Sequence, residues 1–270
     1  MFNYEKYLRI KKFPLIWCAG CGDGIVLKAM LRAIDRIGLN KDEITMVSGI
    51  GCSSRLTGYV DFNTLHTTHG RAIAFATGVK MVKPGMTVIV VTGDGDATAI
   101  GGNHYIHAAR RNIDITVILF NNNIYGMTGG QASPTTPFGF RASTAPYGSV
   151  ENTFNISGLA EAAGASFVAR GTVYDALKLD KMIEKAILKK GFSVVEVMTP
   201  CPTAFGRRNR LGNGAAMIKQ LKEDAVSVQK AESLSEEELA SKIVTGIFVD
   251  RDRPEYTANY QKLVDQLKAK

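Results

Sequence analysis

The chain has 270 residues, of which 45% are hydrophobic and 21% are charged, the balance of an ordinary globular protein. No apolar run approaches the roughly 20 residues that span a bilayer, and the charged N-terminal stretch lacks the apolar core of a signal peptide, so we expect a cytoplasmic protein with no membrane association. The formal net charge is +8, but the basic residues are scattered among acidic ones, which argues against nucleic-acid binding and favours acidic partners or an anionic substrate.

Two of the four cysteines, Cys18 and Cys21, lie in the glycine-rich stretch WCAGCGDG near the start of the chain. Residues 22–38 follow with apolar side chains at helical spacing and a terminal glycine, which predicts a helix packed on a sheet. Residues 44–49 are a predicted strand, and this strand delivers Cys52 to its carboxyl end.

The histidines fall into two pairs. His66 and His69 precede a predicted helix over residues 70–81, and the default interpretation of His66 is a capping or turn residue. His104 and His107 lie within a later predicted helix, where a structural role is favoured because no partner residue suggests acid–base chemistry.

Two runs of β-branched residues, 87–91 and 115–120, are predicted to be buried parallel strands joined by a helix at about 106–111. Asp94 lies between two glycines after the first strand, and Asn122 follows the second. Both clusters therefore belong at the same edge of a parallel sheet, where they can face one ligand. Carboxylate, amide and main-chain oxygens suit Mg²⁺, which takes further ligands from phosphate and water. The alternative is a pair of ordinary strand-end turns.

The segment 132–155 is rich in proline, serine, threonine and glycine, and we expect it to wrap a second subunit. Beyond it, the predicted elements are a helix, a strand, a helix and a strand over residues 156–163, 166–170, 175–190 and 193–198. The fold class is therefore α/β, with a mainly parallel sheet and helices on both faces.

The composition becomes charged and helical after a candidate boundary at Gly212–Gly214. We therefore predict one domain over residues 1–212, which holds all the candidate site residues, and a C-terminal helical extension over residues 213–270. Within that extension, residues 243–250 are a predicted strand.

The fourth cysteine, Cys201, follows the strand predicted over residues 193–198. From spacing alone, the four cysteines are compatible with a zinc site, a four-iron four-sulfur cluster, a redox-active C-x-x-C pair or inert buried thiols. A zinc ribbon would require a second close pair.

Taken together, these motifs resemble a known family. The sequence contains Gly-Asp-Gly and, after nearly thirty residues, Asn-Asn at a strand end. This pattern is similar to the thiamine diphosphate motif. WCAGCG, GIGCS and the late Cys-Pro resemble the cluster-binding cysteines of the thiamine-binding β subunit of 2-oxoacid:ferredoxin oxidoreductases. FPLIWCAGCGDG and TPCPTAFGRRN are most similar to the 2-oxoglutarate type. The resemblance covers about residues 13–209.

The resemblance implies three sets of site residues. Mg²⁺ would be held by the side chains of Asp94 and Asn122 and by the carbonyl of Ile124. The 4Fe-4S cluster would be held by Cys18, Cys21, Cys52 and Cys201. His69 would be catalytic through proton handling, and thiamine diphosphate would be lined by Ile50, Gly51, Cys52, Ser53, His69, Gly95, Asp96, Gly126 and Met127.

The implied activity is oxidative decarboxylation of a 2-oxoacid, 2-oxoglutarate being favoured, with coenzyme A, and with electrons leaving through the cluster to ferredoxin. The implied partner is an α subunit, because thiamine enzymes also need a glutamate supplied by a second module of similar fold. Arg207 and Arg208 are candidates for the distal carboxylate of the substrate, and the alternative is that they are solvated surface arginines. The alternatives are the same chemistry on pyruvate or branched-chain 2-oxoacids, or a non-catalytic metal-binding scaffold for a partner.

Overall fold

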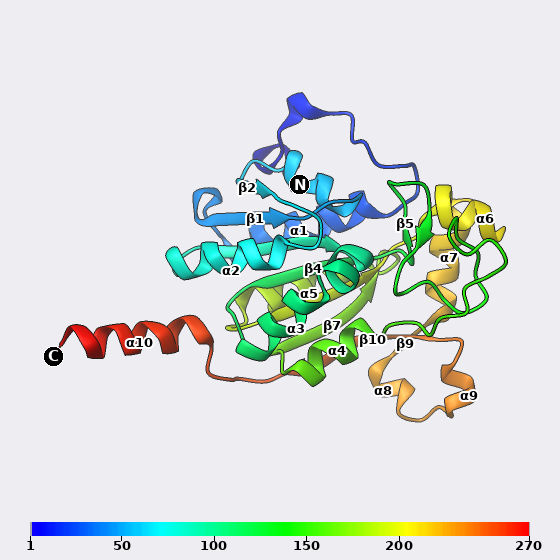
Figure 1. The fold of residues 1–270 in the computed structure, drawn as a ribbon. Coiled ribbons are helices and arrows are strands. Elements are labelled where there is room, and N and C mark those ends of the chain that lie inside the picture. Colours follow the sequence, from blue (N-terminus) through cyan, green and yellow to red (C-terminus); the bar gives the residue numbers. More distant parts are fainter. Residues whose placement is uncertain (1, 270) are drawn as a thin grey trace.

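The computed structural model describes residues 2–269, in which one eight-stranded sheet is covered by helices on both faces (Figure 1). The strands of that sheet are β1 (Ile44–Ser48), β2 (Asn63–His66), β3 (Thr87–Gly93), β4 (Thr116–Asn121), β7 (Phe167–Thr172), β8 (Ser193–Met198), β9 (Ala225–Ser227) and β10 (Ile243–Asp250). A separate short pair consists of β5 (Ile124–Tyr125) and β6 (Gln131–Ala132). The α-helices are α1 (Asp23–Ile37), α2 (Ala72–Val82), α3 (Gly102–Arg111), α4 (Ile156–Ala163), α5 (Ala176–Leu188), α6 (Arg207–Asn209), α7 (Gly214–Asp224), α8 (Val228–Ala231), α9 (Glu236–Leu239) and α10 (Tyr256–Lys268).

The strand order in the main sheet is β2-β1-β3-β4-β8-β7-β10-β9. Neighbouring strands are parallel, except that β10 runs antiparallel to β7. The predicted α/β class with a mainly parallel sheet is therefore confirmed. Among residues 2–269, none of the helices combines the length and the apolar character that crossing a membrane requires.

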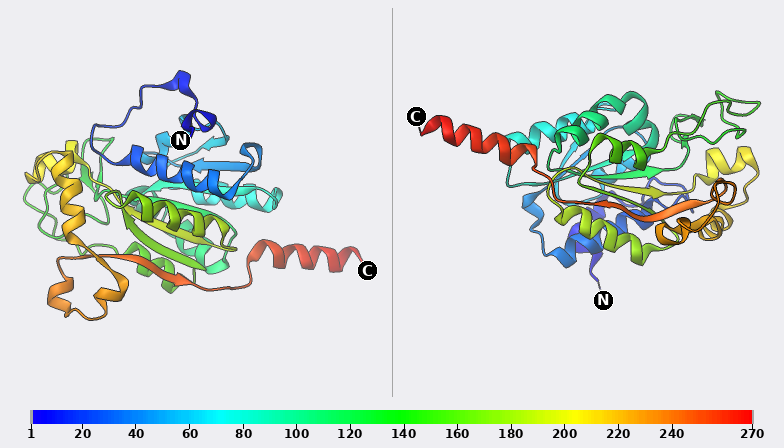
Figure 2. Two further views of the ribbon diagram at one scale, coloured as in Figure 1. Left: turned by 180° about the vertical axis from the view of Figure 1, so that it is seen from behind. Right: turned by 90° about the horizontal axis from the view of Figure 1, so that it is seen from below.

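The two faces of the sheet have separate hydrophobic cores. Leu31 of α1 and Ile183 of α5 belong to one core, and α1 and α5 lie together on one side of the sheet (Figure 2). Ile73 of α2, Tyr105 of α3 and Ile156 of α4 belong to the core on the opposite side. Because the inner strands are buried on both faces, their sequences are nearly continuous apolar runs rather than alternating ones.

The sheet order brings together four loops that carry candidate site residues. β1, β3, β4 and β8 are consecutive neighbours and all parallel, so their carboxyl ends lie along one edge. Cys52 follows β1, Asp94 follows β3, Asn122 follows β4 and Cys201 follows β8. The predicted convergence of these four residues at one sheet edge follows from this topology.

Most predicted elements are confirmed, including helix α4 and strand β10 with the predicted bounds. Placing His66 in a turn or cap was wrong, because His66 is the last residue of β2. The helix predicted at about 106–111 begins earlier, at Gly102, and follows a π-helical turn over Asp96–Ile100. Gly101 permits that tight turn, since a Cβ there would lie 2.4 Å from the carbonyl oxygen of Asp96.

The C-terminal segment joins the sheet and also reaches the cysteine loop. β10 pairs with β7, whereas α10 projects away from the rest of the protein (Figure 1). Asn213 caps α7, and a Cβ built on Gly20 would lie 2.9 Å from the Cα of Gly214. Residues 213–270 thus include helices, the predicted strand β10 and one further short strand, β9, that was not predicted. The division at residue 212 stays a prediction.

A buried ion pair joins β7 to β8. Arg170 Nε lies 2.9 Å from Glu196 Oε2, and Glu196 also accepts hydrogen bonds from Asn121 Nδ2 at 2.8 Å and from Ser157 Oγ at 2.6 Å. Glu196→Ala leaves a guanidinium and an amide without their acceptor, so we expect it to lower the free energy of unfolding by about 3–5 kcal/mol. Urea unfolding of the purified chain measures this loss.

The matched control is Glu223→Ala, which removes an exposed ion pair with Lys219. That variant is expected to change the free energy of unfolding by less than about 1 kcal/mol. Equal losses in the two variants would show that the Arg170–Glu196 pair does not stabilise this part of the sheet.

Candidate active site

A cavity of about 250 Å³ opens at the sheet edge where β1, β3 and β4 end. Its wall includes all the residues predicted from the resemblance to hold Mg²⁺ or to line thiamine diphosphate, and these are Ile50, Gly51, Cys52, Ser53, His69, Asp94, Gly95, Asp96, Asn122, Ile124, Gly126 and Met127. The structure therefore brings these residues into one pocket. Their binding roles stay predictions.

Asp94 is one of two almost fully buried acidic residues of this pocket, and like Asp96 it has 3% of its surface exposed. Its carboxylate oxygen Oδ2 accepts hydrogen bonds from Ser133 Oγ at 2.6 Å and from Thr135 Oγ1 at 2.5 Å. Burial raises the pKa of Asp94 to about 6, although both hydroxyl donors act in the opposite direction. A cation in the pocket would favour the ionised carboxylate, which makes this residue chemically suited to a metal.

The second segment predicted to bind Mg²⁺ is a tight turn after β4. Asn122 Oδ1 accepts a hydrogen bond from the Ile124 backbone N–H at 3.3 Å, and Asn123 adopts a left-handed conformation with φ of 62°. Asparagine tolerates this conformation better than most residues. The turn places the Asn122 amide and Ile124 beside Asp94 in the pocket wall.

His69 lies next to Asp96 in the same pocket. His69 Nδ1 is 2.6 Å from Asp96 Oδ1, but the two groups do not meet with hydrogen-bond geometry. Asp96 is held in place by the Gly70 N–H at 2.7 Å and by Thr92 Oγ1 at 2.7 Å. The ring of His69 thus lies in the pocket wall beside a carboxylate, where it could exchange a proton with a bound molecule.

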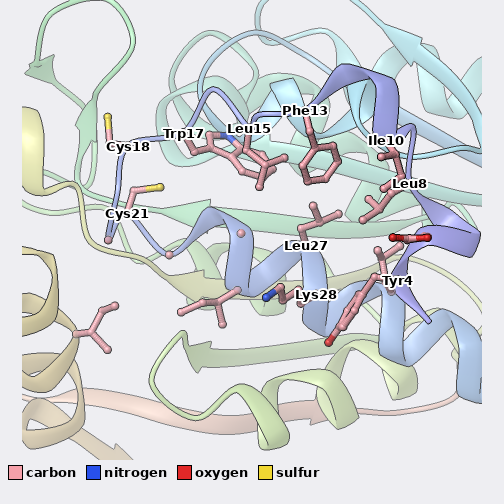
Figure 3. Close-up of a pocket in the computed structure, with 17 residues that line it drawn as sticks. Tyr4, Leu8, Ile10, Phe13, Leu15, Trp17, Cys18, Cys21, Leu27 and Lys28 are labelled. Carbon is pink, nitrogen blue, oxygen red and sulfur yellow. The ribbon is translucent and has the colours of Figure 1, made fainter. Parts of the chain in front are cut away.

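Cys52 and Cys201 approach each other across Gly126. A Cβ built on Gly126 would lie 3.5 Å from Cys52 Sγ and 3.4 Å from Cys201 Sγ. Cys18 and Cys21 project from the N-terminal loop at one end of a second cavity, of about 500 Å³, between the N-terminal segment and α1 (Figure 3). The lining of that cavity is mostly apolar, for example Leu15 and Leu27.

The N-terminal cysteine loop is tied to the loop after β1. Trp17 Nε1 donates a hydrogen bond to the carbonyl of Cys52 at 2.7 Å, and the Ile16 N–H donates to the hydroxyl of Tyr59 at 2.7 Å. The rings of Trp17 and Tyr59 lie 5.4 Å apart between centroids. These contacts hold Cys18 close to Cys52, although 34 positions separate them in sequence.

All four cysteines are free thiols. Burial raises the pKa of Cys21 and of Cys52 to about 12, and the nearby carboxyl of Asp23 adds to both shifts. Burial also raises the pKa of Asp23 to about 7. A thiolate is the form that binds metal, so only a strongly positive group such as iron would hold these sulfurs deprotonated.

Across residues 2–269, no three His, Cys, Asp or Glu side chains are grouped closely enough to hold a single metal ion. A polynuclear cluster instead takes one thiolate per iron at its corners. Cys52 and Cys201, which meet across Gly126 with no side chain between them, would supply two thiolates of that donor set, and Cys18 and Cys21 would supply the other two. For Mg²⁺, the fit rests on the oxygen donors of Asp94 and Asn122.

Sequence analysis missed Ser133, Thr135 and Asp23. Tyr125 lines the pocket and donates a hydrogen bond to the carbonyl of Gly95 at 3.2 Å. Nothing in the local pattern of Ser133 or Thr135 distinguishes them from other hydroxyl residues of the loop. Asp23 could have been identified as a site residue, because it lies two residues after Cys21 in the cysteine motif.

Comparison with known proteins agrees with this geometry. The family described as thiamine pyrophosphate enzyme, C-terminal TPP binding domain, matches residues 49–197. The 2-oxoglutarate synthase subunit KorB of Methanocaldococcus jannaschii is 54% identical over 98% of this chain and 98% of its own length. KorB of Methanothermobacter marburgensis is 51% identical over 99% of this chain and 94% of its own length.

Among solved structures, the chain is similar to a 2-oxoglutarate:ferredoxin oxidoreductase from Magnetococcus marinus with 2-oxoglutarate, coenzyme A and succinyl-CoA bound. The TM-score is 0.88 at 32% identity, and the match covers 99% of this chain and 91% of that one. The fold and the pocket thus define a thiamine diphosphate-binding α/β protein. The chain belongs to the family of β subunits of 2-oxoacid:ferredoxin oxidoreductases, and it resembles the 2-oxoglutarate type.

Proposed function

We propose that this chain is the subunit that binds thiamine diphosphate, Mg²⁺ and a 4Fe-4S cluster in an enzyme that oxidises 2-oxoglutarate. The reaction converts 2-oxoglutarate and coenzyme A to succinyl-CoA and CO₂, and it transfers two electrons, one at a time, to ferredoxin. The observation that carries the proposal is the convergence of Cys52, Asp94, Asn122 and Cys201 from four adjacent strand ends. The identity to KorB relatives supports 2-oxoglutarate over other 2-oxoacids.

The chain's own residues would bind and orient the cofactor. Asp94, Asn122 and the Ile124 carbonyl would hold Mg²⁺ against the diphosphate, and the glycines of the pocket would let the backbone approach it. When bound, thiamine diphosphate supplies the nucleophilic carbon and the electron sink for loss of CO₂. His69, fixed beside Asp96, would hold or move a proton at its ring.

The cysteines would hold the cluster directly beside the cofactor. Cys52 lines the cofactor pocket and also meets Cys201 across Gly126, so one residue belongs to both sites. A short path between the two groups would favour rapid transfer of single electrons out of the pocket. The surplus positive charge of +8 would attract an acidic ferredoxin.

Completion of the active site requires an α subunit, which would supply the glutamate for the aminopyrimidine ring. Two apolar side chains of the pocket wall support an interface at its mouth, because Ile50 is 42% exposed and Met127 is 45% exposed. Of the two arginines proposed for the distal carboxylate, Arg208 lies beside the loop that follows Met127, with Nη2 3.7 Å from the Cβ position of Gly130.

The experiment that tests the activity is ferredoxin reduction by the anaerobically purified αβ complex, with a series of 2-oxoacids and coenzyme A. We expect 2-oxoglutarate to give the highest kcat/KM, because a second carboxylate offers a bidentate contact to an arginine. A preference for pyruvate or branched-chain acids would reassign the substrate. Absence of reduction with every 2-oxoacid would support a non-catalytic scaffold instead.

Gly126→Ala tests the cluster separately from the fold. The added methyl group would lie at ordinary contact distance from Cys52 and Cys201, so the metal-free chain should keep its melting temperature. The same methyl group would occupy the space between the two sulfurs, and we expect bound iron to fall several-fold. Iron content measured after anaerobic purification gives the result. An unchanged iron content would place the cluster elsewhere.

A further inference from the structure

We propose that Ser133 and Thr135 are positioning residues for the metal site, so that the start of the 132–155 loop is a working part of cofactor binding. This inference rests on the proposed binding of Mg²⁺ and thiamine diphosphate at Asp94. It assigns the loop a role inside the pocket, in addition to the expected role as a subunit contact.

The first observation is how the Asp94 carboxylate is held. Both hydroxyl groups meet the same oxygen, Oδ2, at 2.6 Å for Ser133 and 2.5 Å for Thr135. Both residues are buried, and Thr135 is completely inaccessible. Among the described residues, no side chain donates to Oδ1, although backbone N–H groups of Gly95 and Asp94 also contact the carboxylate, so Oδ1 is the oxygen that we propose meets a cation. Two donors on one oxygen fix the rotation of the carboxylate.

The second observation is that the same segment holds the other metal-binding turn. Thr136 Oγ1 donates a hydrogen bond to the carbonyl of Asn123 at 2.6 Å and accepts one from the Ser133 N–H at 2.9 Å. Asn123 lies between the two predicted ligands of this turn. Residues 133–136 therefore bridge the loop after β3 and the loop after β4, which carry all the predicted Mg²⁺ ligands.

The third observation is a rigid support behind the segment. Thr135 Oγ1 is 3.0 Å from Asn121 Oδ1, and the amide nitrogen of Asn121 donates to Glu196 at 2.8 Å. Glu196 in turn pairs with Arg170. A hydroxyl has one proton, which Thr135 shares between Asp94 Oδ2 and Asn121 Oδ1. The acceptor at the end of β4 thereby links the donor to Asp94 to the sheet.

These contacts predict a loss of metal affinity rather than of folding when either hydroxyl is removed. Partners that orient a metal ligand change metal affinity by about 10–100-fold in other proteins, and we expect an effect in that range for Thr135→Val and for Ser133→Ala. Thr135→Ser restores a hydroxyl and is expected to recover most of the affinity. The matched control is Thr116→Val, which removes a buried hydroxyl bonded to the Ala186 carbonyl at the other end of β4.

The experiment titrates Mg²⁺ into the purified αβ complex at fixed thiamine diphosphate, with calorimetry as the readout and melting temperature as a check on folding. Weaker apparent Mg²⁺ binding in Thr135→Val and Ser133→Ala, with normal binding in Thr116→Val, is the expected result. If Thr135→Val does not fold, Ser133→Ala decides the question alone. Binding equal to that of Thr116→Val would overturn the inference.

Asp94→Asn separates this inference from the proposed function on which it rests. If Asp94→Asn loses Mg²⁺ binding while Ser133→Ala and Thr135→Val retain it, the metal site stands and the positioning role is wrong. If Asp94→Asn also binds Mg²⁺ normally, the metal site itself is wrong, and the positioning role falls with it.

Discussion

Asp94→Asn is expected to weaken binding of Mg²⁺ and thiamine diphosphate by more than roughly 100-fold, beyond the range seen for groups that only orient a ligand. The substitution preserves the shape of the side chain, so Ser133 and Thr135 keep an acceptor and the fold should survive. It removes the negative charge of a residue that is 3% exposed, and the other buried carboxylate of the pocket wall, Asp96, is already engaged by the Gly70 N–H and Thr92. Calorimetric titration of thiamine diphosphate in the presence of Mg²⁺ measures the loss.

The control for this substitution is Asp42→Asn, an exposed position just before β1, at the opposite end of the sheet from the pocket. It removes the same charge and should leave binding unchanged. Iron content should be the same in both variants, because Asp94 is not among the proposed cluster ligands. Normal thiamine diphosphate binding by Asp94→Asn would contradict the assigned metal site.

Cys52→Ala is expected to lose bound iron and to keep most of its thiamine diphosphate binding, which is the reverse of the result expected for Asp94→Asn. Cys52 is the cysteine placed between the two sites, since it lines the cofactor pocket and faces Cys201 across Gly126. Loss of one of four thiolates should reduce bound iron from about four atoms per chain to below about one. Thiamine diphosphate binding should weaken far less than in Asp94→Asn. Ferredoxin reduction should fall to background because the electrons have no exit.

Ser193→Ala is a suitable control, because Ser193 is fully buried, its hydroxyl has no hydrogen-bond partner among the described residues, and it lies at the amino end of β8. This variant should bind iron normally. If Cys52→Ala binds as much iron as Ser193→Ala, Cys52 is not a cluster ligand. That result would favour the interpretation of the cysteines as inert buried thiols.

The inner part of the fold could be predicted because its signals are local. β3, β4 and β8 are short β-branched runs, and the small polar residues that end β3 and β4 also carry the candidate ligands. Helix α1 has a regular apolar stripe and is followed by its C-cap residue, Gly38, which has a φ of 76°. In these segments, periodicity, turn chemistry and burial all favour the same structure.

The parts that were missed depend on contacts distant in sequence. β2 has no fully buried residue and includes the polar residues Asn63 and His66, so only its pairing with β1 defines it as a strand. Ser133 and Thr135 meet Asp94 from 39 and 41 positions away, and neither residue type nor spacing shows which hydroxyl of a serine- and threonine-rich loop turns inward. The close packing of Gly214 against Gly20 could not be predicted either, because these two glycines are far apart in sequence and meet only in the folded chain.

The most direct test of the central claim is chemical analysis of the αβ complex purified without oxygen. The account predicts about four iron atoms, about four sulfide ions and about one thiamine diphosphate for each copy of this chain, with Mg²⁺ required to retain the thiamine. Zinc in place of iron, or a complex that retains no thiamine diphosphate in the presence of Mg²⁺, would contradict it.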